Sequence, residues 1–471
     1  MKKLLLAVFS IATTFSLYAQ REVPQERMEQ IYEEVKTPYK YGLAVAPADN
    51  YHKIDCPTVF RQGDKWLMTY VVYNGKGGTD GRGYETWIAE SDNLLEWRTL
   101  GRVLSYRDGK WDCNQRGGFP ALPDMEWGGS YELQTYKGRH WMTYIGGEGT
   151  GYEAVKAPLY VGLAWTKGDI STAHEWESMD KPILSIHDKD AQWWEKLTQY
   201  KSTVYWDKDK TLGAPFVMYY NAGGRHPETD LKGERVGIAL SKDMKTWKRY
   251  SGNPVFAHEA DGTITGDAHI QKMGDVYVMF YFSAFEPSRK YKAFNTFAAS
   301  YDLVNWTDWK GADLIIPSKN YDELFAHKSY VVKHDGVVYH FYCAVNNAEQ
   351  RGIAIATSKS MGRSAVRFPV PESKNRRQIM TLNEGWKTWI TEATHLKGNF
   401  MMPAKTVNIP HNWDDYYGYR QLTHGNLHGT AMYVKDFTAD VKSGKRYFLR
   451  FEGVGTYATI TVNGKNFGRH P

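Results

Sequence analysis

Charged side chains stand directly before several aromatic strands of this 471-residue chain. Asp267 precedes the segment 270–282, in which a Gly-Asp pair is followed by an apolar and aromatic run, and Asp55 stands in the same relation to the segment 58–70. Two carboxyl groups can perform acid–base chemistry if one is protonated and the other is ionised. They can do so together only if the fold brings the starts of different strands to one place.

The starts of the other aromatic strands carry further candidates. The complete set at these positions is Asp55, Asp112 with Arg116, Lys201, Asp267 with His269, and His327 with Lys328. Arg225 lies just after the third aromatic strand, and Glu153 lies in the glycine-rich loop 146–153. Each has a plain structural alternative, because an aspartate before a strand can cap a turn, and Lys and Arg are common on protein surfaces.

A long repeat predicts how these groups meet. Each of five aromatic strands is followed by a second strand that ends in a small residue and Ser or Thr. The second strands are 86–92, 160–166, 236–243, 296–302 and 352–358. Successive copies are about 55 to 75 residues apart, the length of a four-stranded propeller blade with decorated loops. We therefore expect an all-β fold, a five-bladed β-propeller followed by a partial β-sandwich of the jelly-roll type.

The expected domains follow from where the repeat begins and stops. After residue 362 the chain carries Pro369, Pro371 and clustered charge without periodicity, which is typical of a linker. The expected organisation is a signal peptide at 1–19, an N-terminal helix and lead-in at 20–40, the propeller at 41–362, a linker at 363–377 and an incomplete sandwich at 378–471.

The first residues and the charge limit the class of protein. Lys2 and Lys3 precede the apolar run 4–17, and Ala19 offers a cleavage point, as in a secretory signal. We expect export to the periplasm or the extracellular space, and no membrane span. The formal net charge of +6 is not gathered into a basic run, so no nucleic-acid partner is expected. The three cysteines form neither a disulfide framework nor a metal pattern. No cofactor is expected, and a structural calcium on the propeller axis stays open.

The repeat, together with Asp55-Cys56-Pro57 in its first copy, resembles the five-bladed β-propeller glycosidases. That superfamily holds glycoside hydrolase families 32, 43, 62, 68, 117 and 130, and the sequence resembles families 43, 117 and 130 most. The resemblance implies a central funnel in which carboxylates act on a glycosidic bond. It implies that Asp55 is the general base and that Asp267 is the second carboxylate, acting as the acid or as a group that raises the acid's pKa.

The resemblance leaves the identity of the acid open. Family 43 uses a glutamate at the start of an inner strand, and this sequence has none at a clear position of that kind. Glu153 could reach the mouth of the funnel, and His327 is the other candidate, because family 117 resembles a propeller that uses a histidine as the acid. The implied substrate-binding residues are Asp112, Arg116, Lys201, Arg225, His269 and Lys328. Several cations around a funnel suggest a highly hydroxylated or acidic sugar such as a uronate.

The C-terminal segment resembles a second family. Residues 407–414, 450–454 and 462–465 resemble the sugar-binding jelly roll of glycoside hydrolase family 2. The last strands of that jelly roll and the catalytic barrel of that family are absent from this sequence.

The sequence therefore predicts an exported glycoside hydrolase that cleaves a plant or algal poly- or oligosaccharide by single-displacement (inverting) acid–base catalysis. Its partner would be the carbohydrate substrate. One alternative is a family-130-like phosphorylase, in which phosphate replaces water and meets the cations beside Asp55. The other is a propeller that binds glycan without catalysis. Sugar identity, linkage and oligomeric state are not set by the sequence.

Overall fold

The computed structural model describes residues 22–74, 81–152, 158–370, 379–393, 403–413, 429–441, 446–455 and 457–470. The protein divides into two compact units, Met1–Glu372 and Ser373–Pro471. This boundary falls within the segment 363–377, which we expect to be a linker. In the described part of the sequence, no helix combines the length and the apolar character that a membrane crossing requires. The expected signal peptide, 1–19, lies outside the described residues.

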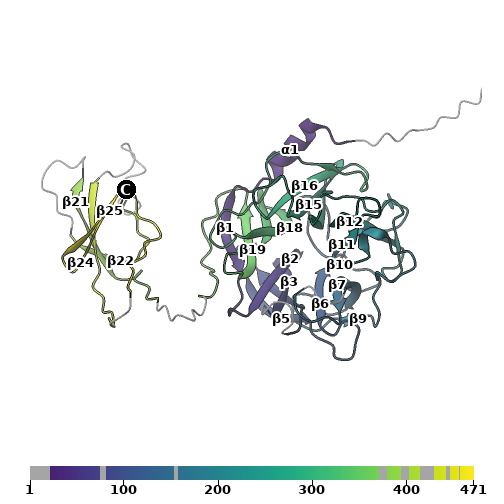
Figure 1. The fold of residues 1–471 in the computed structure, drawn as a ribbon, viewed down its shortest axis with the longest axis horizontal. Coiled ribbons are helices and arrows are strands. Elements are labelled where there is room, and N and C mark those ends of the chain that lie inside the picture. Colours follow the sequence, from purple (N-terminus) through teal and green to yellow (C-terminus); the bar gives the residue numbers. More distant parts are fainter. Residues whose placement is uncertain are drawn as a thin grey trace, which may run out of the picture. The chain divides into compact units, whose positions relative to one another are not determined.

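The first unit is the five-bladed β-propeller that the repeat predicts, with its blades arranged around a common centre (Figure 1). The first blade contains β2 (His52–Gln62), β3 (Lys65–Asn74), β4 (Glu85–Ser91) and β5 (Arg98–Leu104). The second contains β6 (Gln115–Pro120), β7 (His140–Gly147), β8 (Tyr160–Thr166) and β9 (Glu177–Ser178). The third contains β10 (Thr198–Trp206), β11 (Phe216–Arg225), β12 (Lys232–Ser241) and β13 (Trp247–Arg249). The fourth contains β14 (Ile264–Met273), β15 (Val276–Ala284), β16 (Ala293–Ser300) and β17 (Thr307–Asp308). The fifth contains β18 (Phe325–His334), β19 (Val337–Val345) and β20 (Arg351–Thr357).

The fifth blade is completed by a strand from the beginning of the unit. Strand β1 (Tyr39–Val45) pairs antiparallel with β20 as the outermost strand of that blade. Helix α1 (Gln25–Val35) precedes it and buries Met28, Ile31 and Val35 against the fourth and fifth blades. The ring is therefore closed by hydrogen bonds between the two ends of the propeller sequence. The sequence repeat does not reveal this closure, because a strand's distant partner leaves no local pattern.

A shared turn explains the tryptophan that follows the second strand in the first and third blades. In the third blade, Ser241 Oγ accepts the backbone N–H groups of Asp243 (3.1 Å) and Met244 (3.0 Å). Met244 adopts a positive φ of 70°, and Trp247 Nε1 donates to its carbonyl oxygen at 2.8 Å. The segment 91–97 repeats this arrangement in the first blade. The tryptophan thus locks the turn before the outermost strand, where a serine hydroxyl replaces ladder hydrogen bonds.

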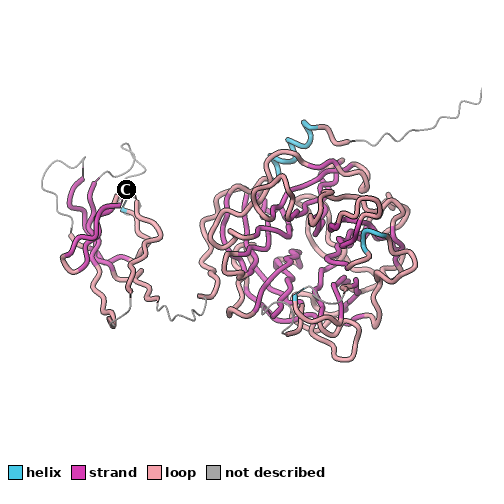
Figure 2. The backbone as a smooth tube through the Cα atoms, viewed as in Figure 1, coloured by secondary structure: helices cyan, strands magenta, loops and turns pink. Residues whose placement is uncertain are grey.

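Apolar side chains fill the space between neighbouring blades. Tyr205 and Val217 of the third blade pack with Ile270 and Met279 of the fourth, and all four are buried. The first and fifth blades meet through a similar cluster, so the closed ring has no break in its core. Figure 2 shows the inner strands converging on the centre, which is where the charged groups at their starts must meet.

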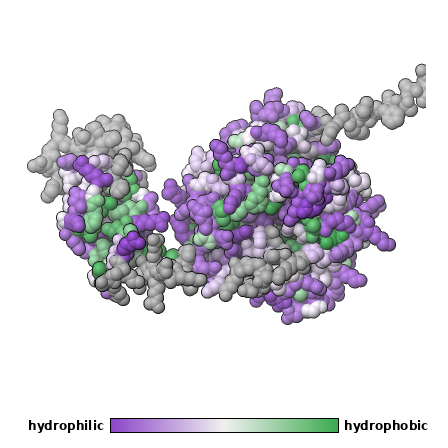
Figure 3. Space-filling view, in the orientation of Figure 1, coloured by the Kyte–Doolittle hydropathy of each residue, from purple (hydrophilic) through white to green (hydrophobic). Residues whose placement is uncertain are grey.

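The second unit contains two small sheets. One has the order β22 (Lys405–Val407), β21 (Trp386–Ala393) and β23 (Gly429–Val434), and the other pairs β24 (Ala458–Val462) with β25 (Lys465–His470). Residues 447–454 pair with no other described segment, so they form no ladder. Phe437, Phe448 and Phe451 are exposed, and hydrophobic residues gather on this unit in the view of Figure 3.

Candidate active site

The innermost strands of four blades share one irregularity near their start. In each of these strands, two residues bulge out of register with the neighbouring strand of the same blade. The second blade is the exception, because its inner strand β6 pairs without a shift. The bulged pairs are Cys56-Pro57, Tyr200-Lys201, Asp267-Ala268 and Lys328-Ser329. Cys56, Asp267 and Lys328 have positive φ angles of 53°, 57° and 61°. A bulge re-aims side chains at the end of a strand, and such a conformation is uncommon for residues other than glycine.

The bulges define how the two predicted aspartates correspond. Asp55 is the last residue paired before its bulge, opposite Val71. Asp267 is the first residue inside its bulge, because Gly266 is the last one paired. The two aspartates therefore stand one position apart in otherwise equivalent strands. We use the name axial cluster for Asp55, Lys201, Asp267, His327, Lys328 and Arg351. Lys328 links its two parts, because the charges of both Asp55 and Asp267 act on it.

Asp55 is a fully buried carboxylate surrounded by cations. Its Oδ2 lies 3.2 Å from Arg351 Nη1 and 3.9 Å from Lys328 Nζ, and its Oδ1 accepts the backbone N–H of Cys56 at 2.8 Å. Burial alone would raise the pKa of Asp55, but the charge of Lys328, with further contributions from His327 and Arg351, holds that pKa well below its ordinary value. Asp55 is consequently ionised at neutral pH and can only accept hydrogen bonds.

Lys201 and Asp267 meet on the propeller axis. Lys201 Nζ lies 3.7 Å from Asp267 Oδ2, and each side chain is only 2% exposed. The same Nζ lies 5.4 Å from the ring centre of Phe119 and 5.9 Å from that of Tyr330. These four residues belong to the inner strands of the second to fifth blades, so their meeting point is the centre of the ring. Two sequence-predicted residues of different blades are thus brought together there.

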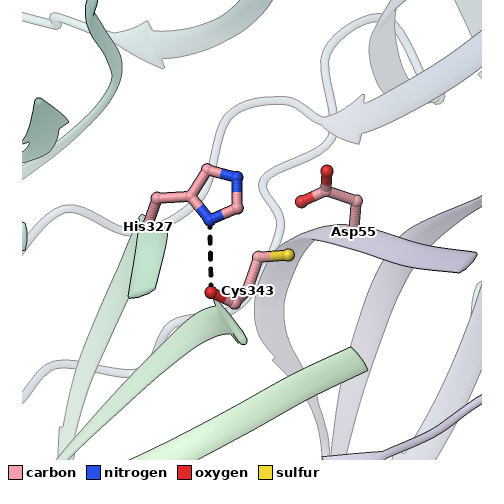
Figure 4. Close-up of side chains that lie close together, drawn as sticks. All are labelled: Asp55, His327 and Cys343. Atoms are coloured by element: carbon pink, nitrogen blue, oxygen red, sulfur yellow. Dashed lines mark hydrogen bonds between the residues drawn. The ribbon is translucent and has the colours of Figure 1, made fainter. Parts of the chain in front are cut away.

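His327 and Cys343 lie beside Asp55, and Figure 4 shows their side chains near its carboxylate. The three possible ligand atoms lie within 4.8 Å of one another. His327 Nδ1 donates to the carbonyl oxygen of Cys343 at 3.3 Å. Burial lowers the pKa of His327 to about 3, so its imidazole is neutral at neutral pH. The proton-donor role that the sequence offers for His327 requires the imidazolium form, and this pKa argues against that role.

The same group is a poor fit to a metal ion. Burial raises the pKa of the Cys343 thiol, whereas a metal binds the thiolate. Asp55 already faces Arg351 and Lys328, whose positive charges would repel a cation. We therefore assign these residues to the chemistry of the axial cluster itself.

The structure adds a carboxylate that the sequence analysis missed. Glu234, near the start of β12, accepts a hydrogen bond from Asn221 Nδ2 at 3.0 Å. Asn221 Oδ1 in turn accepts the backbone N–H of Asp267 at 3.4 Å. A single amide thus connects Glu234 to the axial cluster, and the Glu234 side chain is partly exposed. An acid must exchange its proton with solvent, so this position suits one.

A topological rule could have found Glu234 from the sequence. In an antiparallel blade the third strand runs in the same direction as the first, so both start at the same end of the blade. A parallel bridge joins Glu234 to Ile264 at the start of β14, which confirms this alignment. Arg351 at the start of β20 was missed for the same reason. Candidate residues must therefore be sought at the starts of third strands as well as innermost ones.

The loop that carries Glu153 reaches the axial cluster. Glu153 itself lies outside the described residues. Its neighbour Tyr152 accepts a hydrogen bond through its hydroxyl from Arg351 Nη1 at 3.0 Å, and its ring stacks on Tyr73 at 4.9 Å between centres. The guanidinium of Arg351 thus bridges Tyr152 and Asp55. This contact places Tyr152 close to Asp55.

Asp112 and Arg116 do not join the axial cluster. Both are fully buried, and Asp112 Oδ2 lies 3.2 Å from Arg116 Nε and 2.8 Å from Arg107 Nη2. Arg116 also pairs with Glu175 at 2.5 Å, and Tyr144 donates to Asp112 at 2.8 Å. Their charges are satisfied within the protein, so we correct their assignment from substrate contacts to structural residues. The second blade lacks the bulge that turns side chains toward the axis.

His269 and Arg225 take no part in the ion pairs of the axial cluster. His269 is buried, stacks on Tyr330 with 3.8 Å between ring centres, and donates from Nε2 to the carbonyl oxygen of Val331 at 3.0 Å. Burial lowers its pKa to about 3, so its imidazole is neutral at neutral pH. Arg225, at the end of β11, is exposed and pairs with Asp230 at 3.3 Å.

Comparison with solved structures finds close relatives. A structure described as a complex of BT0996 and RGII is 96% identical and covers 75% of this chain and all of its own length, with a TM-score of 0.74. A second, described as "Glycoside hydrolase", is 95% identical with the same coverage and TM-score. This protein is a glycoside hydrolase. Together with the five blades, these matches confirm the resemblance to the propeller glycosidases.

More distant structures do not assign this glycoside hydrolase to one numbered family. A thermostable family-43 glycoside hydrolase is 15% identical, covering 70% of this chain and 99% of its own, and a family-117 enzyme of the marine bacterium Zobellia galactanivorans is 13% identical, covering 69% and 91%. Their TM-scores are 0.46 and 0.48, which are too low to choose between the two. No family model and no curated protein matches the sequence.

Proposed function

We propose that this glycoside hydrolase is exported and cleaves a terminal glycosidic bond in the plant or algal saccharide named RGII. The proposed identity of the substrate rests on the 96% identical structure described as a complex with RGII. At this identity the side chains that contact a ligand are almost all shared. Export is proposed from the secretory pattern of residues 1–19.

We assign the proton donor to Glu234. Asp55 is fully buried between Arg351 and Lys328, and Asp267 is buried beside Lys201. Glu234 accepts a hydrogen bond from Asn221, and its side chain is partly exposed. Of these three carboxyl groups, Glu234 is the one open to solvent, so it is best placed to take up a proton and pass it to the leaving oxygen of a glycoside.

We assign the general base to Asp55, in a single-displacement reaction that inverts the anomeric carbon. Ion pairs with Arg351 and Lys328 withdraw charge from its carboxylate. The same ion pairs keep the carboxylate ionised, as a general base must be. The competing arrangement uses Glu153, beside Tyr152, as a nucleophile and retains the anomeric configuration.

The cations of the axial cluster make phosphorolysis an alternative to hydrolysis that the assay must distinguish. Lys201, Lys328 and Arg351 outnumber Asp55 and Asp267 by one positive charge, because His327 is neutral. Inorganic phosphate could meet this charge, as phosphorolysis requires. Hydrolysis and phosphorolysis differ in their need for phosphate, so the assay below includes both conditions.

The test uses the protein without residues 1–19 and measures sugar release from RGII oligosaccharides and from a panel of para-nitrophenyl glycosides. We expect release in phosphate-free buffer, and NMR should show the inverted anomer as the first product. If no sugar were released from RGII oligosaccharides, the proposal that RGII is the substrate would be wrong. If sugar were released only in the presence of phosphate, the reaction would be phosphorolysis and the proposed hydrolysis would be wrong. A retained anomer would replace Asp55 by Glu153 in the second catalytic role.

A further inference from the structure

Two charged atoms at the centre of the propeller lack hydrogen bonds. Lys201 Nζ and Asp267 Oδ2 are buried and make no hydrogen bond with any described residue. They lie 3.7 Å apart, which is an ion-pair distance and longer than a hydrogen bond. Leaving a buried charged donor and a buried charged acceptor unsatisfied is unfavourable, and native proteins rarely do so without a functional reason.

A second buried Lys–Asp pair in the same unit shows what a structural pair looks like. Lys40 Nζ pairs with Asp322 Oδ2 and also donates to the carbonyl oxygen of Ile316 at 2.6 Å. Asp322 accepts the hydroxyl of Tyr342 at 2.7 Å and the backbone N–H of Lys319 at 2.7 Å. Both charges of that pair are therefore satisfied by the protein. The pair on the axis has the same residue types without these partners.

The separation of the axial pair fits a single hydroxyl group. Hydrogen bonds to a hydroxyl oxygen are about 2.8 Å long, so one oxygen can lie within bonding distance of two atoms that are 3.7 Å apart. A hydroxyl has one proton to donate to a carboxylate and lone pairs to accept from an ammonium group. A carboxylate on the ligand would fit poorly, because Asp267 would repel it.

We propose that Lys201 and Asp267 form the recognition site for one hydroxyl group of the sugar that this enzyme releases. The hydroxyl donates to Asp267 Oδ2 and accepts from Lys201 Nζ. This proposal rests on the function proposed above and gives the pair a binding role, with Asp55 and Glu234 kept for catalysis. A site built to bond a hydroxyl rejects an analogue that lacks it, because both buried charges then stay unsatisfied.

The test compares the wild-type enzyme with Lys201→Met on the para-nitrophenyl glycoside that the wild type cleaves and on its monodeoxy analogues. With the wild-type enzyme, we expect kcat/KM for one monodeoxy analogue to be at least about 100-fold lower than for the parent glycoside. With Lys201→Met the parent glycoside should fall to about the level of that analogue, and the analogue should lose less than about tenfold relative to it. Equal losses for every analogue in both proteins would overturn the proposal.

Two further variants keep the result interpretable. Asp267→Asn preserves the shape of the side chain and should reduce discrimination against the same analogue, so it replaces Lys201→Met if that variant does not fold. Lys40→Met removes the lysine of the satisfied pair outside the axis. It should lower the unfolding temperature while leaving discrimination among the analogues unchanged.

A binding measurement separates this proposal from the hydrolase assignment. Calorimetry with the free monosaccharides of the panel needs no turnover. Binding of one sugar to the wild type, lost in Lys201→Met, would support the hydroxyl site even if no glycoside were cleaved. Equal binding of that sugar to both proteins would overturn the site even if hydrolysis were established.

Discussion

Asp55 and His327 occupy the same register position in the innermost strands of the first and fifth blades, each as the last paired residue before the bulge. The pKa values of both are lowered, so at neutral pH the carboxylate is charged and the imidazole is not. The two positions therefore contribute one negative charge, which Lys328 and Arg351 face. Equivalent sites in adjacent blades thus differ in charge while sharing a backbone conformation.

Replacement of Asp55 by Asn should lower kcat by about 10²- to 10⁴-fold, the range for losing a general base. Asparagine keeps the shape of the side chain, so the fold should persist although Arg351 and Lys328 lose their anionic partner. Sugar release under saturating substrate measures the effect, and circular dichroism checks the fold. An Asp55→Asn protein that is folded and retains more than about a tenth of wild-type kcat would exclude a catalytic role for this residue.

Replacement of Glu234 by Gln should affect substrates according to their leaving group. A para-nitrophenolate leaves without protonation, whereas the oxygen of a natural sugar needs a proton from the acid. We expect kcat/KM to fall by about 10²-fold or more on RGII oligosaccharides and much less on the activated glycoside. Asn221→Ala, which removes the amide between Glu234 and Asp267, is the comparison variant and should show a smaller difference. Equal losses of Glu234→Gln on both substrates would contradict the assignment.

Local pattern and distant pairing contributed differently to what the sequence could predict. The repeat identified five blades because each blade contains its own strands and turns, and the aspartates at strand starts were found by the same reasoning. The pairing of β1 with β20 and the positions of Glu234 and Arg351 depend on which strands lie side by side. The bulges also depend on pairing, and their absence from the second blade explains why Asp112 and Arg116 were misplaced.

Three buried histidines make the stability of the propeller depend on pH. Burial lowers the pKa values of His269, His327 and His340 to about 3, whereas an unfolded histidine titrates near 6.5. Between these values the unfolded state binds more protons, so this stabilisation is complete above about pH 6.5 and is lost as the pH falls toward 3. Each histidine should contribute about 1.4 kcal/mol per pH unit across this range.

Urea denaturation at several pH values between 7 and 4 measures this dependence. His340 provides the comparison, because it is not one of the proposed catalytic groups. It forms a hydrogen bond of 2.6 Å with Ser329 Oγ. In His340→Gln the slope of the unfolding free energy against pH should fall by about 1.4 kcal/mol per pH unit, which corresponds to one proton fewer taken up on unfolding. An unchanged slope would show that His340 titrates normally in the folded protein.

Removal of β1 together with helix α1 should prevent the propeller from folding. Strand β1 supplies the outermost strand of the fifth blade, and without it the edge of β20 and the buried residues Leu43 and Ala44 lose their partners. A protein that begins at residue 22 should unfold at the same temperature as the full-length protein, and one that begins at residue 47 should not accumulate as a monomeric folded protein. Thermal unfolding and gel filtration distinguish the two. A stable monomer that begins at residue 47 would show that closure by β1 is dispensable.

The burial of the axial pair predicts that only a terminal sugar is released. Lys201 and Asp267 are 2% exposed, and the stacked rings of His269 and Tyr330 lie next to them on the inner strands, so a polysaccharide cannot pass through the centre. A sugar whose hydroxyl reaches this depth must therefore stand at the end of its saccharide. Mass spectrometry of RGII oligosaccharides at low conversion should show one monosaccharide and a product shortened by a single residue. Internal fragments at the same conversion would mean that the substrate is bound across the surface instead, with its reacting bond away from the axial pair.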